Sequence, residues 1–276
     1  AIGNGLEMIA GPGGPDGSSD NDSVFRSLTV DPTDADTVIL GTERNGAVVS
    51  HDGGVTWTRS REGMRHDDTG YSEFWDIAIS PHDPSLVIAA TLGSPGPVAG
   101  DWPSSSAGVY RSTDGGATWA RSNCGLTNSR ITSVSFDAVD ASVVVIGIEG
   151  GMPSFTPAPP SGYANGGLLR SSDAGLTWVQ VSEGSSADTN GFWRMESRDA
   201  GGAVGLVLTF GMDYTDLDQN LGFMRSVDGG VTWTGFADEH RTRQITSFDA
   251  SSDGQTIYAH ERSGFAKWRS DDGGVT

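Results

Sequence analysis

The sequence predicts an all-β protein, a β-propeller of four-stranded antiparallel blades, about five of which lie in the chain. Two observations predict this fold. A turn motif recurs five times along the 276 residues, and such recurrence is typical of repeat architectures. The composition agrees, because 40 glycines and 12 prolines separate short apolar runs, as they do in sheets joined by many tight turns.

The turn motif is an octapeptide of the form Ser-x-Asp-x-Gly-x-Thr-Trp. Its first copy covers residues 50–57, and successive copies start 44 to 62 residues apart, the length of one blade. The Asp and Ser side chains can bond to nearby backbone groups and the Gly can adopt a positive φ, so each copy is predicted to be a hairpin turn. The Trp offers an apolar face for packing between blades. The motif residues are Ser50, Asp52, Gly54, Thr56, Trp57, Ser112, Asp114, Gly116, Thr118, Trp119, Ser171, Asp173, Gly175, Thr177, Trp178, Ser226, Asp228, Gly230, Thr232, Trp233, Ser270, Asp272, Gly274 and Thr276.

Each repeat fits four antiparallel strands, which we call a to d from the innermost outwards. In the first repeat the predicted strands are 25–30, 37–42, 47–50 and 56–59. The later a and b strands are predicted at 75–79 with 87–91, 131–136 with 142–148, 192–197 with 203–210, and 245–248 with 256–260. The predicted blades are 24–60, 74–122, 130–182, 191–236 and 243–276, within one domain that spans residues 1–276.

A propeller has to join its last blade to its first, and two solutions are open. Residues 5–11 resemble the strand d segments that follow the other motif copies, so they could complete the fifth blade and close a five-bladed ring. The alternative is a propeller of six to ten blades, of which this chain forms part.

The octapeptide resembles the Asp box, or BNR repeat, of bacterial sialidases, sortilin luminal domains and xyloglucanases. In those families the box is structural, so the resemblance implies that its aspartates are not catalytic. The spacing of strands and turns within the blades resembles that of the xyloglucanases best, notably at residues 30–34 and 79–84. In that family a catalytic Asp follows strand b of the first blade, and Glu43 stands at the matching position. Of the sialidase Arg-Ile-Pro motif only Arg26 is kept.

Strand order assigns the connections to two faces. The a-to-b and c-to-d turns share one face, and the b-to-c and d-to-a connections lie on the opposite face. Three b-to-c connections are long, at 93–108, 149–167 and 211–222, and loops of such length are often functional. These loops and the starts of the inner strands carry aromatic rings, arginines and carboxylates suited to contact with a sugar or peptide. The predicted ligand-binding residues are Arg26, Trp75, Asp76, Trp102, Glu149, Tyr163, Trp193, Arg194, Asp213 and Tyr214.

Glutamates recur where strand b ends. Aligning residues 41–44, 147–149 and 259–262 places Glu43, Glu149 and Glu261 at one position in blades one, three and five. Glycoside hydrolysis needs two carboxyl groups about 5 to 10 Å apart. If blade five closes against blade one, Glu43 and Glu261 are therefore the predicted catalytic pair.

Charge and composition limit the partners. The net charge is −19 and Lys267 is the sole lysine, which argues against a nucleic-acid partner because a phosphate backbone needs a basic surface. Cys124 is the single cysteine and allows no internal disulfide, and no stretch is long enough to span a membrane. No cofactor is expected. A weaker possibility is calcium at Asp16, Asp20 and Asp22, although that segment lacks the Gly and the final Glu of a calcium loop.

Together these features favour a monomeric binding scaffold for a glycan or a peptide, which would use the long-loop face. Decorated loops without a complete catalytic set are the reason for this interpretation. The family resemblance implies a secreted or cell-surface location. The alternative function is that of a glycoside hydrolase, xyloglucanase-like or sialidase-like, or of a fragment of one.

Overall fold

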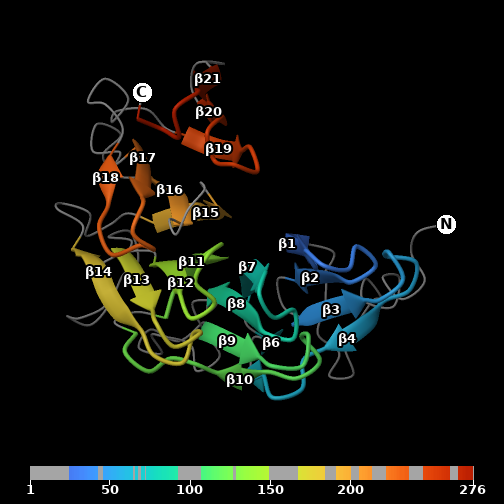
Figure 1. Cartoon of the computed structure of the whole chain (residues 1–276). Coiled ribbons are helices and arrows are strands. Elements are labelled where there is room, and N and C mark those ends of the chain that lie inside the picture. Colours follow the sequence, from blue (N-terminus) through green and yellow to red (C-terminus); the bar gives the residue numbers. More distant parts are fainter. Residues whose placement is uncertain are drawn as a thin grey trace. The chain divides into compact units, whose positions relative to one another are not determined.

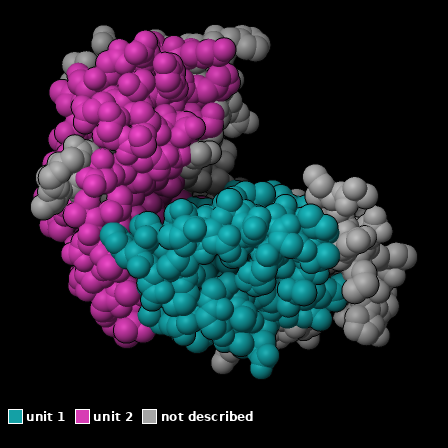
Figure 2. Space-filling view, turned by 45° about the vertical axis from the view of Figure 1, so that its right-hand side comes forward, with its two compact units in different colours: residues 1–123, 129–131 teal, residues 124–128, 132–276 magenta. Residues whose placement is uncertain are grey.

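The computed structural model describes residues 25–42, 46–64, 66–67, 70–71, 73–92, 107–126, 129–148, 167–183, 191–199, 205–212, 222–235, 245–261 and 267–275. Within these ranges every regular element is a strand, and no helix could cross a membrane. The chain forms two compact units, residues 1–123 with 129–131 and residues 124–128 with 132–276 (Figure 2). Each unit is described by itself.

The first unit contains two four-stranded antiparallel sheets (Figure 1). The first sheet has the order β1-β2-β3-β4, and the second has the order β7-β8-β9-β10 with a small hairpin, β5-β6, before it. Both are the meanders that the sequence predicts. Their bounds are β1 (Phe25–Val30), β2 (Val38–Thr42), β3 (Ala47–Ser50), β4 (Thr58–Ser60), β5 (His66–Asp67), β6 (Gly70–Tyr71), β7 (Glu73–Ile79), β8 (Val87–Leu92), β9 (Gly108–Ser112) and β10 (Ala120–Arg121).

The second unit repeats the pattern with a third and a fourth sheet of four strands and a fifth sheet with three described strands. Residues 5–11, which were expected to complete the fifth blade, lie outside the described residues. The bounds are β11 (Ile131–Phe136), β12 (Val144–Ile148), β13 (Gly167–Ser171), β14 (Val179–Glu183), β15 (Gly191–Asp199), β16 (Gly205–Met212), β17 (Gly222–Ser226), β18 (Thr234–Gly235), β19 (Ile245–Ala250), β20 (Ile257–Glu261) and β21 (Lys267–Ser270).

Each of the four complete octapeptides forms a closed hydrogen-bonded turn between strands c and d. In the first copy Asp52 accepts hydrogen bonds from Ser50 Oγ (2.8 Å), the Thr56 backbone N–H (2.8 Å) and Thr56 Oγ1 (2.6 Å). Ser50 Oγ accepts in turn from the backbone N–H of Gly54, whose φ is +85°. Because Thr56 bonds to Asp52, strand β4 begins at Thr58, later than predicted. The same ring recurs at Asp114, Asp173 and Asp228.

The hydrogen bonds of this turn lower the pKa of its aspartate side chain. The hydrogen bonds from Thr56, and then that from Ser50, lower the pKa of Asp52 to about 2. The hydrogen bonds from Thr177 and Ser171 lower the pKa of Asp173 to about 2 as well. These carboxylates are ionised acceptors occupied by their own turn, as a structural role requires.

The box turns of the first, second, third and fifth sheets also bond to the a-to-b turns of their own sheets. The Gly53 N–H donates to the carbonyl of Asp36 (2.9 Å), and the Gly115 N–H donates to that of Ser85 (2.8 Å). Ala174 and Gly273 make the same bond in the third and fifth sheets. The two kinds of turn therefore share one end of each of these four sheets, as the strand order predicts.

Within each unit, adjacent sheets pack face to face. We call the side of a sheet that packs on the next sheet along the chain its leading face, and the side that packs on the preceding sheet its trailing face. In the first unit the leading face of the first sheet meets the trailing face of the second, where the Phe74 and Trp119 rings are edge to face at 6.0 Å. The leading residues are Ile39, Ala47 and Val49, and the trailing residues are Phe74, Ile77, Ile79 and Trp119.

The box Trp ties its sheet to the one before it. Trp119 Nε1 donates to Ser60 Oγ (2.8 Å), and Ser60 Oγ bonds to the Gly116 carbonyl. The segment that leaves the first sheet runs beside Trp119, whose backbone N–H donates to the Glu62 carbonyl (2.9 Å). In the second unit the Trp178 N–H donates in the same way to the Cys124 carbonyl (2.9 Å).

Candidate functional site

Four of the inner strands share an irregularity at their beginning. The antiparallel register shifts between Phe25 and Ser27, between Phe74 and Asp76, between Phe192 and Met195, and between Ile245 and Ser247. The extra residues are Arg26, Trp75, the pair Trp193 and Arg194, and Thr246. Bulges of this kind re-aim side chains and are frequent beside active sites.

Four predicted ligand-binding residues therefore occupy bulges, which the sequence analysis did not foresee. A signal for them was present, since a Phe followed by Arg or Trp opens three of these strands, at residues 25–26, 74–75 and 192–193. The shared bulge explains why different polar and aromatic residues can replace one another there. A bulge residue is outside the regular ladder and is not held to its packing.

In the first unit two bulges bring a charged and an aromatic side chain together. Arg26 Nε lies 2.9 Å from Glu73 Oε1, and Arg26 Cζ lies 5.2 Å from the centre of the Trp75 ring. We call these three residues the Arg26–Glu73–Trp75 cluster. Glu73 is largely buried, whereas Arg26 and the indole are partly exposed. Sequence reasoning missed Glu73, because a glutamate at the start of a strand has no distinguishing pattern.

Asp76 supports the bulge. Its Oδ1 accepts a hydrogen bond from the backbone N–H of Ile77 at 2.9 Å, directly after the register shift. A local side-chain acceptor of this kind fixes an irregular backbone. We therefore assign Asp76 a contact that positions Trp75, while its predicted contact with a ligand stays a prediction.

The cluster offers three kinds of contact. The partly exposed indole gives a flat apolar surface, and the guanidinium over it is favourably placed by the charge distribution of the ring. The ion pair holds Arg26 to Glu73, and it also supplies charge-assisted hydrogen-bonding groups. Such a surface suits a neutral ligand that combines apolar faces with hydroxyl groups.

The remaining predicted residues fall outside this description. The structure describes only the backbone of Trp193, Arg194 and Glu261. The loop residues and the first two glutamates lie outside the described residues, namely Glu43, Trp102, Glu149, Tyr163, Asp213 and Tyr214. Asp16, Asp20 and Asp22 also lie outside them, and among the described residues no three His, Cys, Asp or Glu side chains are grouped to hold a metal ion.

The strand register corrects the expected alignment of the glutamates. The box serine of each sheet pairs with the start of strand b, Ser50 with Val38 and Ser270 with Ile257. Counted from these pairs, Glu261 corresponds to Thr42, one residue before Glu43. The alignment of Glu261 with Glu43 was therefore wrong, and because successive strand positions face opposite sides of a sheet, it no longer supports pairing the two.

The alignment of Glu149 with Glu43 agrees with the register. Ser171 pairs with Val144, and Ile148 then corresponds to Thr42, so that Glu149 follows the same position as Glu43. The Glu-Arg dipeptides at residues 43–44 and 261–262 look alike in sequence but stand at different distances from the start of strand b.

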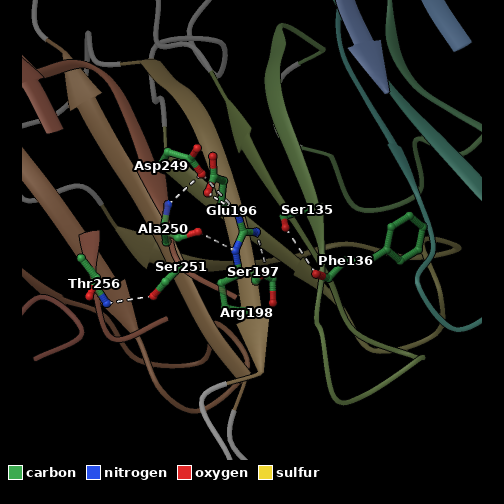
Figure 3. A network of polar contacts seen from close by, with 9 residues as sticks. All are labelled: Ser135, Phe136, Glu196, Ser197, Arg198, Asp249, Ala250, Ser251 and Thr256. Carbon is green, nitrogen blue, oxygen red and sulfur yellow. Dashed lines mark hydrogen bonds and ion pairs between the residues drawn. The ribbon is translucent and has the colours of Figure 1, made fainter. Parts of the chain in front are cut away.

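A second polar network lies at the other end of the inner strands, in the second unit (Figure 3). The Arg198 guanidinium lies between two carboxylates, 2.8 Å from Glu196 and 3.5 Å from Asp249. Arg198 Nε also donates to the Ala250 carbonyl (3.2 Å). The network ties the fourth sheet to the fifth.

Arg198 replaces a turn residue of the other sheets. By register it corresponds to Asp31, whose carboxylate accepts hydrogen bonds from the backbone N–H groups of Thr33 and Asp34. Ser80 and Asp137 act in the same way after their own inner strands, and Ser251 accepts a hydrogen bond from the backbone N–H of Thr256. Arg198 instead bonds across to the neighbouring sheet, so we assign this network a structural role.

The box turns and the successive antiparallel meanders define the class of this protein, an Asp-box β-propeller of the BNR type. The BNR/Asp-box repeat model matches residues 48–59 and 110–121, the first two box turns. The fold and the family resemblance read from the sequence are therefore confirmed.

Comparison with curated proteins identifies the xyloglucanases as relatives. The chain is 23% identical to a xyloglucanase of Paenibacillus sp. over 232 residues, which cover 72% of this chain and 20% of that protein. It is 25% identical to the xyloglucanase Xgh74A of Acetivibrio thermocellus over 228 residues, 75% of this chain and 25% of that protein. The chain thus spans a quarter or less of the curated relatives it matches.

A solved structure shows the same fold. The GH74 enzyme of Niastella koreensis matches 91% of this chain and 37% of its own, with a TM-score of 0.62 and 17% identity. The antiparallel sheets of the two units are thus propeller blades.

Proposed function

We propose that this chain is the glycan-binding part of a glycoside hydrolase of the xyloglucanase type, with the polysaccharide lying across the beginnings of the inner strands. The observation that carries the proposal is the Arg26–Glu73–Trp75 cluster on two neighbouring bulges. Similarity to two xyloglucanases over about three quarters of the chain supports the substrate class.

The chemistry of the cluster favours a neutral glycan. A sugar ring packs its apolar face on the Trp75 indole while its hydroxyl groups exchange hydrogen bonds with Arg26 and Glu73. A sialic acid would need a guanidinium available for its carboxylate, whereas Arg26 is already ion-paired with Glu73. The net charge of −19 also disfavours an anionic polysaccharide. The sialidase-like alternative is therefore the weaker of the two hydrolase functions.

Catalysis is assigned to Glu43 as one of the two carboxyl groups that glycoside hydrolysis requires. Glu43 directly follows Thr42, and Thr42 pairs with Phe25, the residue before Arg26. The sequence thus places it next to the strand position that faces the bulge. Since Glu261 is level with Thr42 rather than with Glu43, the proposal keeps Glu43 and assigns no second carboxyl group. A secreted location accompanies the proposal, since the substrate of such an enzyme is outside the cell.

Binding and turnover should be measured separately. Isothermal titration with xyloglucan oligosaccharides is expected to show binding that Trp75→Ala weakens about tenfold or more, the size of a buried aromatic contact. Leu176→Ala removes an exposed side chain of the third sheet and serves as the control that leaves binding unchanged. Sialyllactose is expected not to bind.

Release of reducing ends from xyloglucan tests the catalytic assignment. Glu43→Gln is expected to abolish turnover with binding retained. Binding without any turnover by the unmodified chain would instead support the scaffold function expected from the sequence. A chain that binds neither xyloglucan nor a cello-oligosaccharide would refute the proposal.

A further inference from the structure

Gly41, in strand β2, lies directly opposite the bulge that carries Arg26. Gly41 pairs with Ser27 and Thr42 pairs with Phe25, so Arg26 is the extra residue between the two pairs. Strand β2 also packs on strand β7, the inner strand of the second sheet. The glycine therefore lies beside the bulge, at the junction of the first two sheets.

No side chain fits at this position without displacing its neighbours. A Cβ atom built on Gly41 would lie 2.5 Å from Phe74 Cβ and 2.4 Å from Ser27 Oγ. Gly41 is not one of the glycines with a positive φ, so glycine is needed here for space and not for backbone conformation. A glycine within a strand often marks the close approach of another chain segment, and here that segment is strand β7.

Phe74 is the residue through which this close approach arranges the cluster. It lies between Glu73 and Trp75 in the sequence and is fully buried. Because its Cβ is bonded to the backbone, Phe74 can retreat from Gly41 only if strand β7 moves with it. Such a shift would carry Glu73 and Trp75 away from Arg26, which belongs to the first sheet. The 2.9 Å ion pair and the 5.2 Å contact with the ring therefore depend on the missing side chain at Gly41.

The position of Gly41 is not restricted to glycine in the other sheets. Counted from the residue that pairs with the box serine, it is occupied by Ala90, Gly147, Phe210 and His260 in the second to fifth sheets. Sheets of this type therefore accept larger side chains at this place. The glycine of the first sheet is a requirement of its own junction, where the cluster lies.

We propose that Gly41 is a positioning residue of the glycan site. By leaving room for Phe74, it holds the second sheet close enough for Glu73 and Trp75 to meet Arg26. The assignment rests on the proposed glycan-binding function for its ligand, whereas the arrangement of the three side chains can be tested without any ligand. Gly41→Ala is expected to separate the cluster while keeping the fold, because an added methyl group displaces packed atoms without abolishing the structure.

Fluorine NMR of the chain labelled with 5-fluorotryptophan tests the arrangement, with the Trp75 signal assigned from Trp75→Phe. Arg26→Met is expected to shift this signal in the unmodified chain, because the guanidinium lies over the ring. Gly41→Ala is expected to shift it too, and Arg26→Met is expected to have little further effect in that variant. Gly63→Ala crowds the Trp119 carbonyl oxygen at the same pair of sheets and is expected to leave the signal in place. A Trp75 signal unchanged by Gly41→Ala would overturn the proposal.

Isothermal titration with a xyloglucan oligosaccharide tests the consequence for binding. Gly41→Ala is expected to weaken binding about tenfold or more, as Trp75→Ala does, whereas Gly63→Ala is expected to bind as the unmodified chain does. Gly41→Ala/Ser27→Ala removes one of the two close atoms and is expected to recover part of the affinity and of the Trp75 signal position. As the milder variant, it also carries the test if Gly41→Ala does not fold.

The outcomes distinguish the role of Gly41 from the proposed function. If the unmodified chain and Gly41→Ala bind the oligosaccharide equally well, the positioning role is refuted. If the unmodified chain binds no oligosaccharide, the glycan site is refuted, and the fluorine signal then decides by itself whether Gly41 sets the contact between Arg26 and Trp75.

Discussion

Gly63, in the segment that follows the first sheet, allows a test of how adjacent sheets are joined. Gly63 has a φ of +82°, and a Cβ atom built on it would lie 1.9 Å from the Trp119 carbonyl oxygen. Gly63→Ala therefore meets two penalties. A left-handed backbone costs about 1 to 2 kcal/mol for a residue other than glycine, and the forced displacement of packed atoms costs about 1 to 3 kcal/mol.

The matched control separates the two penalties. Gly115 also has a positive φ, +69°, but no atom lies within 4 Å of the position its Cβ would take. The equivalent box position of the third sheet is occupied by Ala174 at a φ of +57°, so alanine is tolerated there. We expect Gly115→Ala to lower the free energy of unfolding by about 1 to 2 kcal/mol, and Gly63→Ala to lower it by about 2 to 5 kcal/mol, always more than Gly115→Ala.

Urea denaturation followed by tryptophan fluorescence measures the difference. The midpoint is expected to fall much further for Gly63→Ala than for Gly115→Ala, at an unchanged dependence on urea concentration. Gly125→Ala, whose Cβ would lie 2.1 Å from the Trp178 carbonyl oxygen, should repeat the large effect in the second unit. Equal losses at Gly63 and Gly115 would show that the linker is not held against Trp119, and the reasoning would fail.

Three further predictions concern side chains. Ser60→Ala removes the acceptor of Trp119 Nε1 and is expected to cost about 1 to 3 kcal/mol in urea denaturation, with Ser60→Thr recovering part of it. Arg198→Met leaves the buried Glu196 without its ion pair and is expected to lower the free energy of unfolding by about 3 kcal/mol. The double variant Arg198→Met/Glu196→Gln is expected to lose less, and a double variant as unstable as the single one would contradict this. The carboxyl groups of Asp52 and Asp173 have a folded pKa of about 2, below the ordinary value of 3.8, so the folded state binds fewer protons than the unfolded state between these two values. Their contribution to the free energy of unfolding is therefore present above pH 4 and is lost as the pH falls towards 2. The urea midpoint should accordingly decline less steeply with falling pH for Asp52→Asn/Asp173→Asn than for the unmodified chain.

The box turns explain why so much of the fold could be predicted from the sequence. Ser50, Asp52 and Thr56 form their hydrogen bonds within one turn, so a local pattern is sufficient to recognise it. Once the turn is placed, the register follows from the pairing of its serine with strand b. The position of the inner strand in the sequence then follows too, because a short turn that bonds to the box joins strand a to strand b.

The candidate site was predicted less well because it depends on contacts between strands. Arg26 and Trp75 were found from their types and positions, whereas Glu73 becomes notable only when it lies 2.9 Å from Arg26. Arg198 was missed because nothing in its own segment shows that it replaces a turn residue. The misplaced Glu261 has the same origin, since a dipeptide match carries no information on the pairing partner.

The bond between Trp119 and the Glu62 carbonyl has a consequence for the order in which the protein forms. The segment at Glu62 is synthesised well before its partner in the following sheet, so the exit of one sheet is secured only when the next sheet has been made. Stability in such repeat arrays is roughly a sum of each unit and its junctions with its neighbours. A substitution that disrupts one box therefore also destabilises the sheet that precedes it. If translation pauses between two repeats, the last completed sheet still lacks the hydrogen bond from the next box Trp.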